Sequence, residues 1–161
     1  MISPAEGQLS QKWLHLSTAE AQVAVGLRNE GDMIPVLQTR LTGPKANCFV
    51  ACLASILELP IERVPDFYEI GADGKEAMTE VQRWLINRGL QLVALKAPTH
   101  LLPMAHLIAE GPSPRGRKHA MVYFGANPIH DPHPDGSGLI KVDLFRVFVA
   151  THPNKVNVWD A

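Results

Sequence analysis

One cysteine stands where a long apolar segment begins. Cys48 follows Asn47 and opens the run 49–57, in which every residue except Ser55 is apolar. A helix N-terminus carries about half a positive charge and several unpaired N–H groups, so it favours the thiolate that attacks electrophiles. We therefore predict that Cys48 is a nucleophile with a lowered pKa at the start of a buried helix. Cys52 lies one turn further among apolar neighbours, and we expect it to pack in the core.

A cysteine nucleophile needs a base to take its proton, an acceptor that orients the base, and donors for the developing oxyanion. His119 opens an apolar segment, and Asp131 ends the next one. If segments 119–124 and 129–131 pair as a hairpin through the turn at 125–128, the start of the first lies opposite the end of the second. The pattern thus predicts that His119 and Asp131 are neighbours, as base and orienting carboxylate.

The oxyanion donors expected from the sequence are the backbone N–H of Cys48 and one side-chain amide. Gln38 can reach back over the cleft, whereas the competing amide, Asn47, is better suited to cap the helix. The loop 111–116 ends just before His119, and it is either a connector or a wall of the substrate site. The candidate substrate contacts are Asn47, Arg115 and Gly116.

The run His130-Asp131-Pro132-His133-Pro134-Asp135 has a second interpretation. Imidazole and carboxylate groups are good ligands for zinc or iron, so the run could bind a divalent metal. Two prolines direct alternate side chains to opposite sides, however, which opposes the convergence of all four groups. His133 and Asp135 could equally be turn residues, and His130 should face away from Asp131. We predict no metal and no other cofactor.

The elements that position these residues follow from hydrophobic periodicity and from turn signals. Helices are predicted at 17–27, at 48–58 and after Asp73-Gly74, where Met78, Val81, Trp84 and Leu85 share a face and Gly89 follows the end. Strands are predicted at 33–38, 90–95, 106–109, 119–124, 129–131, 139–142 and 146–150. Helices followed by strands are typical of the α+β class. We expect N-terminal helices and a central, buried Cys-bearing helix packed on a C-terminal antiparallel β-sheet.

Composition excludes several classes of protein. The chain has 161 residues, 46% hydrophobic and 19% charged, with a net charge of −1, which suits one globular unit and gives no basic face for nucleic acid. We interpret the one basic cluster, 115–118, as a solvated loop. No apolar run reaches the roughly 18–20 residues that span a bilayer. Two cysteines four residues apart make a poor disulfide, so we expect free thiols and a cytoplasmic location.

Several segments resemble small papain-like cysteine peptidases, and the similarity spans roughly Val36 to Leu139. The relatives are phage and bacterial proteins related to the leader-cleaving peptidase domain of bacteriocin exporters. The segments that carry the resemblance are Gln38-Thr39, Asn47-Cys48-Phe49, Ala51–Leu57, Leu59-Pro60, Val64-Pro65, Arg115-Gly116, His119–Val122 and His130–Pro134.

This resemblance implies a papain-like fold with Cys48 as nucleophile, His119 as base, Asp131 as the residue that orients it and Gln38 in the oxyanion hole. The step from Gln38 to Cys48 is longer than is usual in the family. The N-terminal segment lies outside the resemblance, so we expect an extension with a short helix at 1–35 and a catalytic domain at 36–161 within one globular unit.

The expected activity is cysteine-dependent hydrolysis of an amide, isopeptide or thioester bond through an acyl-enzyme. Peptidases, isopeptidases, deamidases and acyltransferases share this machinery, so the residues leave the reaction subtype open. The expected partner is a protein or peptide substrate, with a host protein as one candidate, and neither nucleic acid nor membrane. The alternative is a catalytically idle papain-like scaffold that binds another phage or bacterial protein. The oligomeric state does not follow from the sequence.

Overall fold

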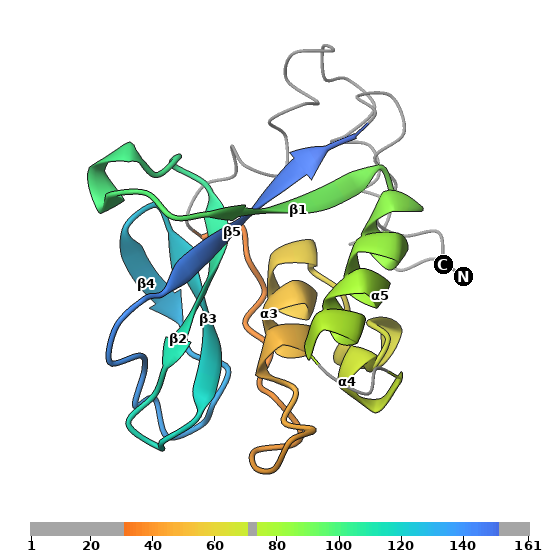
Figure 1. Cartoon of the computed structure of the whole chain (residues 1–161), viewed down its shortest axis with the longest axis horizontal. Helices are drawn as coiled ribbons and strands as arrows, with labels where there is room; N and C mark the ends of the chain where they lie inside the picture. Colours follow the sequence, from red (N-terminus) through yellow and green to blue (C-terminus); the bar gives the residue numbers. More distant parts are fainter. Residues whose placement is uncertain (1–30, 71–73, 152–161) are drawn as a thin grey trace.

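The computed structural model describes residues 31–70 and 74–151. The helix expected at 17–27 and most of the extension expected at 1–35 lie outside the described residues. Within them the chain is mixed helix and sheet, with three α-helices grouped on one side of the strands (Figure 1). The predicted α+β class is therefore confirmed.

The described strands form one antiparallel sheet in the order β1-β5-β2-β3-β4. The central strand β2 pairs with β3 on one side and with β5 on the other, and β4 is the edge strand beside β3. The strands of the sheet are β1 (Leu90–Leu95), β2 (His106–Pro112), β3 (Lys118–Phe124), β4 (Asn127–His130) and β5 (Leu144–Ala150). The helical elements are α3 (Cys48–Leu57), η1 (Ile61–Arg63), α4 (Phe67–Ile70), α5 (Gly74–Ile86) and η2 (Thr99–Leu101).

Helix α3 lies at the centre of the molecule because it is apolar all round. All residues from Phe49 to Leu57 are buried, and α3 packs against β3 and β2. The main core joins this helix to the inner face of the sheet, including Ile108 and Val122. Burial of each large aliphatic or aromatic side chain contributes about 1.5–3 kcal/mol, so α3 anchors the residue at its first position firmly.

The central strand β2 is covered on both faces. Successive residues of a strand point to opposite sides, so Ile108 joins the main core while Leu107 and Ala109 join a second cluster with Phe145.

No described helix is long and apolar enough to cross a membrane.

Segment 33–38 is not a strand, which corrects the sequence prediction. Its backbone groups bond to three separate places in place of a neighbouring strand. The N–H of Val36 donates to Ser55 Oγ (2.9 Å), the N–H of Gln38 donates to the Pro132 carbonyl (2.9 Å), and His130 Nε2 donates to the Val36 carbonyl (2.8 Å). The segment is therefore an extended strap that crosses α3 and the residues after β4.

Segment 139–142 is also not a strand. It runs beside the end of β2 with single hydrogen bonds, from Ile140 N–H to the Pro112 carbonyl and from Asp143 N–H to the Glu110 carbonyl (both 2.8 Å). A Cβ on Gly111 would overlap the carbonyl oxygen of Lys141, so only glycine permits this close approach. The regular ladder with β2 begins only at Leu144.

Helix α5 confirms the predicted amphipathic helix, and β1 confirms the strand that follows it. Val81 and Leu85 are buried in the main core, and Trp84 packs edge-on against Phe67. Gly89 has φ of 74°, the left-handed conformation expected after a helix end.

Candidate active site

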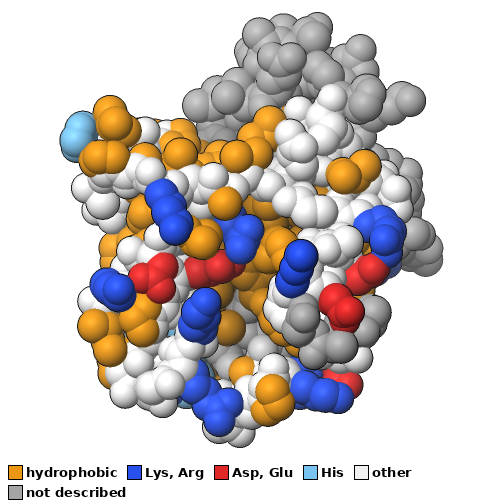
Figure 2. All heavy atoms as spheres, viewed as in Figure 1, with side chains coloured by type: hydrophobic (Ala, Val, Ile, Leu, Met, Phe, Trp, Pro, Cys, Tyr) orange, Lys and Arg blue, Asp and Glu red, His pale blue; other side chains and the backbone are white. Residues whose placement is uncertain are grey.

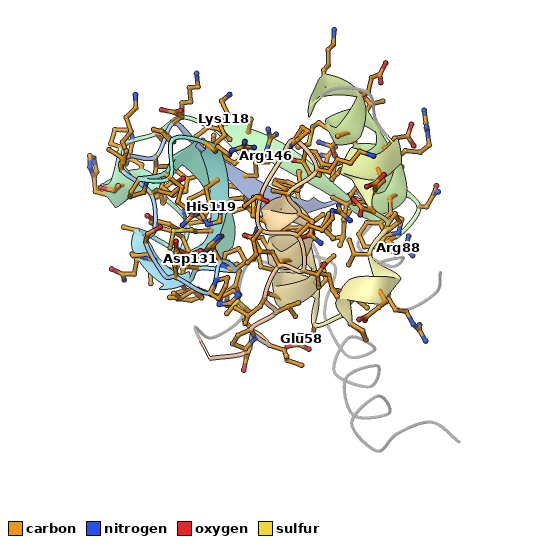
Figure 3. The ribbon with its side chains drawn as sticks, turned by 90° about the horizontal axis from the view of Figure 1, so that it is seen from below. Glu58, Arg88, Lys118, His119, Asp131 and Arg146 are labelled. Carbon is orange, nitrogen blue, oxygen red and sulfur yellow. The ribbon has the colours of Figure 1, made fainter. Side chains whose placement is uncertain are left out.

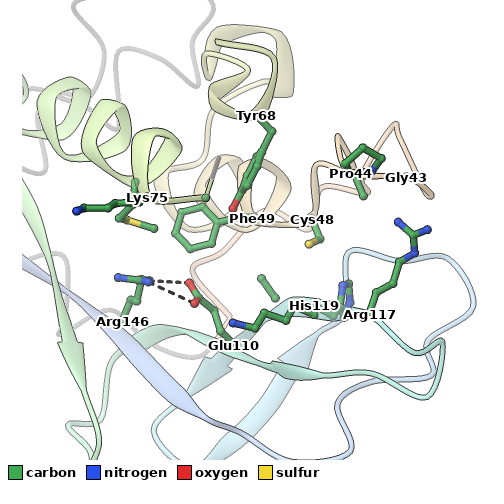
Figure 4. Close-up of a pocket in the computed structure, with 15 residues that line it drawn as sticks. Gly43, Pro44, Cys48, Phe49, Tyr68, Lys75, Glu110, Arg117, His119 and Arg146 are labelled. Atoms are coloured by element: carbon green, nitrogen blue, oxygen red, sulfur yellow. Dashed lines mark hydrogen bonds and ion pairs between the residues drawn. The ribbon is translucent and has the colours of Figure 1, made fainter. Parts of the chain in front are cut away.

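Cys48 is the first residue of α3, as predicted. The helix body behind it is fully buried, whereas Cys48 is only partly buried. Figure 4 shows its sulfur on the helix side of a pocket, facing the strand that carries His119. Cys52, one turn further, is completely buried, which confirms that it packs in the core.

The predicted hairpin brings His119 and Asp131 together. Strand β3 pairs antiparallel with β4 around a tight turn at Gly125, whose φ is 57°, and the pairing places Val122 opposite His130. Continuing this register puts Asp131 diagonally across from His119. His119 Nε2 and Asp131 Oδ1 are 2.7 Å apart, and the two side chains lie side by side in Figure 3.

Asp131 is itself held by the loop that follows it. The backbone N–H of His133 donates to Oδ1 (2.8 Å) and the backbone N–H of Gly138 donates to Oδ2 (2.9 Å). Burial raises the pKa of Asp131, but the hydrogen bonds from His119, His133 and Gly138 outweigh it, and the net pKa is lowered. Asp131 is therefore a fixed carboxylate at neutral pH.

The protonation of Cys48 and His119 differs from the sequence expectation. Burial raises the pKa of the Cys48 thiol more than the N–H groups of Ala120, Phe49 and Cys48 lower it, and the carboxylate of Glu110 adds to the rise. Burial also lowers the pKa of His119, against the opposing effect of Asp131. Both shifts favour the neutral forms, so the resting pair is a thiol and an imidazole.

Gln38 reaches the site despite its long spacing from Cys48. Residues 39–46 leave as a loop and return, and Asn47 closes the loop at its base. Asn47 Oδ1 accepts the N–H groups of Thr39 (3.1 Å) and Arg40 (2.9 Å), and Nδ2 donates to Thr39 Oγ1 (2.9 Å). This loop takes up the residues between Gln38 and Asn47, and Gln38 lines a hollow together with Cys48 and His119.

The predicted helix cap at Asn47 is wrong. Asn47 occupies the N-cap position, but its side chain makes no capping hydrogen bond, because its amide is committed to Thr39 and Arg40. The side chain is buried and lines neither of the hollows beside Cys48. Asn47 therefore positions the loop that carries Gln38 towards Cys48.

The Gln38 side chain is buried, and its amide is partly committed. Its Nε2 donates to the Arg40 carbonyl (2.7 Å), while its buried Oε1 has no partner among the described residues. An amide nitrogen carries two hydrogens, so one remains for another acceptor.

Two hollows meet at Cys48 and His119. The larger, of about 610 Å³, extends under Phe49 and Tyr68 towards the start of α5. The smaller, of about 130 Å³, lies on the side of Gln38 and the β2–β3 turn. Both are lined by Cys48, His119, Ala46, Arg117 and Lys118, so the thiol and imidazole stand at their junction.

The other predicted substrate contacts lie in the β2–β3 turn. Arg115 lines the smaller hollow, but its guanidinium binds Asp135 (2.7 Å) and Ser137. Gly116 has φ of 76° and lines neither hollow. Arg115 thereby links this turn to the loop that holds Asp131.

The polar side chains of the run 130–135 contact different partners and do not converge on one site. His130 binds the strap at Val36, Asp131 orients His119, and His133 Nδ1 lies 2.9 Å from Asp135 while its ring packs edge-on against His119. Within the described residues, no group of three or more His, Cys, Asp or Glu side chains is placed to hold a metal ion.

Comparison of the chain with protein-family models, curated proteins and solved structures finds no significant match.

The sequence patterns did not assign three residues of the larger hollow, Tyr68, Glu110 and Arg146, to the site. Glu110 on β2 and Arg146 on β5 form a two-point ion pair (2.6 and 3.3 Å), and the Arg146 guanidinium lies 5.9 Å from the Phe49 ring centre (Figure 4). Burial raises the pKa of Tyr68, so its hydroxyl stays protonated in the larger hollow. No local motif marks these residues, because their proximity depends on the pairing of distant strands.

Proposed function

We propose that the protein is a cysteine-dependent hydrolase of the papain-like type, with Cys48, His119 and Asp131 as its catalytic triad. One observation carries the proposal. Cys48, at the start of a buried helix, and His119 line the same two hollows, while Asp131 Oδ1 lies 2.7 Å from Nε2 of the His119 ring. A nucleophile, a base and an orienting acceptor are the three parts that this chemistry requires.

The proposed reaction begins with proton transfer from the Cys48 thiol to His119. Because Asp131 occupies Nε2, Nδ1 is the nitrogen that takes this proton as sulfur attacks the carbonyl carbon. The Cys48 N–H and the remaining hydrogen of Gln38 Nε2 stabilise the oxyanion. The tetrahedral intermediate collapses, the leaving amine, or the thiolate of a thioester, takes the proton from His119, and a thioester to Cys48 remains.

Water then resolves this acyl-enzyme. His119 takes a proton from the water as its oxygen attacks the thioester, and returns the proton to sulfur as the carbon–sulfur bond breaks. The products are a carboxylic acid and the free thiol. An amide, an isopeptide and a thioester pass through the same steps, and only the leaving group differs.

A catalytically idle scaffold that binds another protein is the second candidate. Two observations favour it: burial raises the pKa of Cys48, and one hydrogen of the Gln38 amide is used by the Arg40 carbonyl. Both would weaken a nucleophile or an oxyanion hole.

Site-resolved alkylation separates the two candidates. We expect iodoacetamide at pH 7.5 to modify Cys48 much faster than the buried Cys52, as measured by mass spectrometry of the peptides. His119→Ala should slow the Cys48 reaction about a hundredfold, the lower end of what a positioned base contributes. His100→Ala, the same change at an exposed histidine in η2, is the control. Equal and slow labelling of both cysteines in the unmodified protein would contradict the hydrolase and favour the scaffold.

A further inference from the structure

Among the charged residues that line the larger hollow, Lys and Arg predominate. Among the described residues, four Lys or Arg side chains line it, but only one Asp or Glu side chain does. The chain as a whole has a net charge of −1, so this distribution is local. Figure 2 shows Lys and Arg side chains bordering the hollow between the sheet and the helices. The four cations are Lys75, Arg117, Lys118 and Arg146.

The single acidic residue does not neutralise this lining. Glu110 is engaged by Arg146 in the two-point ion pair, and these two charges balance one another. Within the described residues, neither Arg117 nor Lys118 has an acidic partner within ion-pair distance. Their positive charge is therefore available to a bound molecule.

Arg117 and Lys118 occupy the position where charge matters most. They precede His119 directly in the chain, and they line both hollows that meet at the thiol. Of the residues that the structure describes, no Asp or Glu lines the smaller hollow. Figure 4 shows Arg117 beside His119, and Arg146 on the far side of Glu110. A substrate that occupies either hollow with its carbonyl at Cys48 therefore lies in a cavity that both cations line.

We propose that the substrate is an acidic peptide segment, with Asp or Glu side chains next to the carbonyl that Cys48 attacks. The proposal rests on the proposed function and adds its substrate class. Both cations are exposed, so each contact with a carboxylate acts at the surface and is screened by salt. The sequence indicated only a solvated loop at 115–118, whereas this proposal assigns a substrate contact to Arg117 and Lys118.

A matched pair of peptide electrophiles tests this inference. Two short peptide acyloxymethyl ketones, identical except for Glu or Gln at the two residues next to the reactive ketone, are compared by their rate constants for labelling Cys48. We expect the Glu peptide to react about three- to tenfold faster at low ionic strength, since each exposed ion pair contributes a few-fold at most. The ratio should approach one at 0.5 M salt, as expected for about a 4 Å Debye length.

The matched variants assign the effect to the two cations. The double variant Arg117→Ala/Lys118→Ala should bring the ratio of Glu to Gln labelling close to one. Lys96→Ala/Lys141→Ala removes the same charge from residues that line neither hollow, and should preserve the ratio. Equal labelling by both peptides in the unmodified protein would overturn the inference and leave the hydrolase intact.

Failure of both peptides to label Cys48 would instead count against the hydrolase itself. The charge preference is then decided without chemistry, by fluorescence anisotropy of the same Glu and Gln peptides, lacking the ketone, on Cys48→Ala. Tighter binding of the Glu peptide supports the inference, and equal binding overturns it. A short single-stranded oligonucleotide that protects Cys48 from iodoacetamide better than the Glu peptide would also overturn it, in favour of a nucleic-acid ligand.

Discussion

Burial governs the chemistry of single residues in this site. It raises the pKa of Cys48 and lowers that of His119, so neither group is charged at rest. A preformed thiolate–imidazolium pair would react with electrophiles even in mild acid, whereas a neutral pair must transfer a proton during attack. The orientation of His119 by Asp131 is then essential, because the ring nitrogen that accepts the proton has to point towards the thiol.

Glu110 makes the neutral thiol more stable, and its removal should make Cys48 more reactive. In Glu110→Gln the nearby negative charge is lost and Arg146 is left unpaired, and both changes favour the thiolate. We expect the pH profile of Cys48 alkylation to move to lower pH, and the rate at pH 7 to rise about two- to fivefold, the effect of one weak charge interaction. Glu62→Gln, an exposed acid in η1, is the control. An unchanged or alkaline-shifted profile would contradict this role.

At the scale of elements, local patterns predicted the hairpin but not the strap. The turn residues at Gly125 and the apolar segments on either side are close in sequence, so their pairing could be predicted, and with it the contact between His119 and Asp131. Segment 33–38 has a similar apolar pattern. Its hydrogen-bond partners, however, are Ser55, His130 and Pro132, and no local signal identifies them.

The same limit applies to Asn47. Its position before an apolar helix predicts a cap, because Asn is favoured there. In the structure the Asn47 amide instead closes the 39–46 loop, and no local sequence signal indicates this role. The residues between Gln38 and Cys48 therefore form a loop whose closure depends on Asn47.

Asn47→Ala should open this loop and weaken the site. The substitution leaves the N–H groups of Thr39 and Arg40 without their acceptor, at a cost of about 1–3 kcal/mol in the free energy of unfolding. We also expect slower alkylation of Cys48, because the 39–46 loop that precedes it is no longer held in place. Asn47→Asp keeps the acceptor and should lose less stability, and Thr39→Val, which removes a single hydrogen bond, is the control. Urea denaturation measures the effect, and an Asn47→Ala protein as stable as the parent would refute the assignment.

At the scale of the whole molecule, the site lies where three parts of the chain meet. The strap and loop before α3 bring Gln38, the buried helix brings Cys48, and the hairpin with its following loop brings His119 and Asp131. The helix and hairpin could be predicted from periodicity and turn residues. The cationic lining could not, because Lys75, Arg117 and Arg146 come from three separate elements or turns that only the folded sheet brings together.

This shared location couples the stability of the fold to the protonation of the site. The pKa of His119 is lowered in the folded chain, so below about pH 6.5 the unfolded chain binds a proton that the folded one resists. The pKa of Asp131 is also lowered, so its contribution is present above about pH 3.9 and is lost as pH falls through the folded value. Both effects have the same sign, and stability rises with pH.

Urea denaturation between pH 4 and pH 8 should therefore show a free energy of unfolding that is highest near neutrality and declines in acid. His119→Asn should flatten the decline that begins below about pH 6.5, because the group that takes up the proton is gone. Asp131→Asn should make the decline below about pH 6.5 larger. The carboxylate of Asp131 raises the pKa of His119, so its removal lowers that pKa further in the folded protein. A parent protein that gains stability between pH 7 and pH 5 would show that His119 is charged in the folded state, and would replace the neutral pair by an ion pair with Asp131.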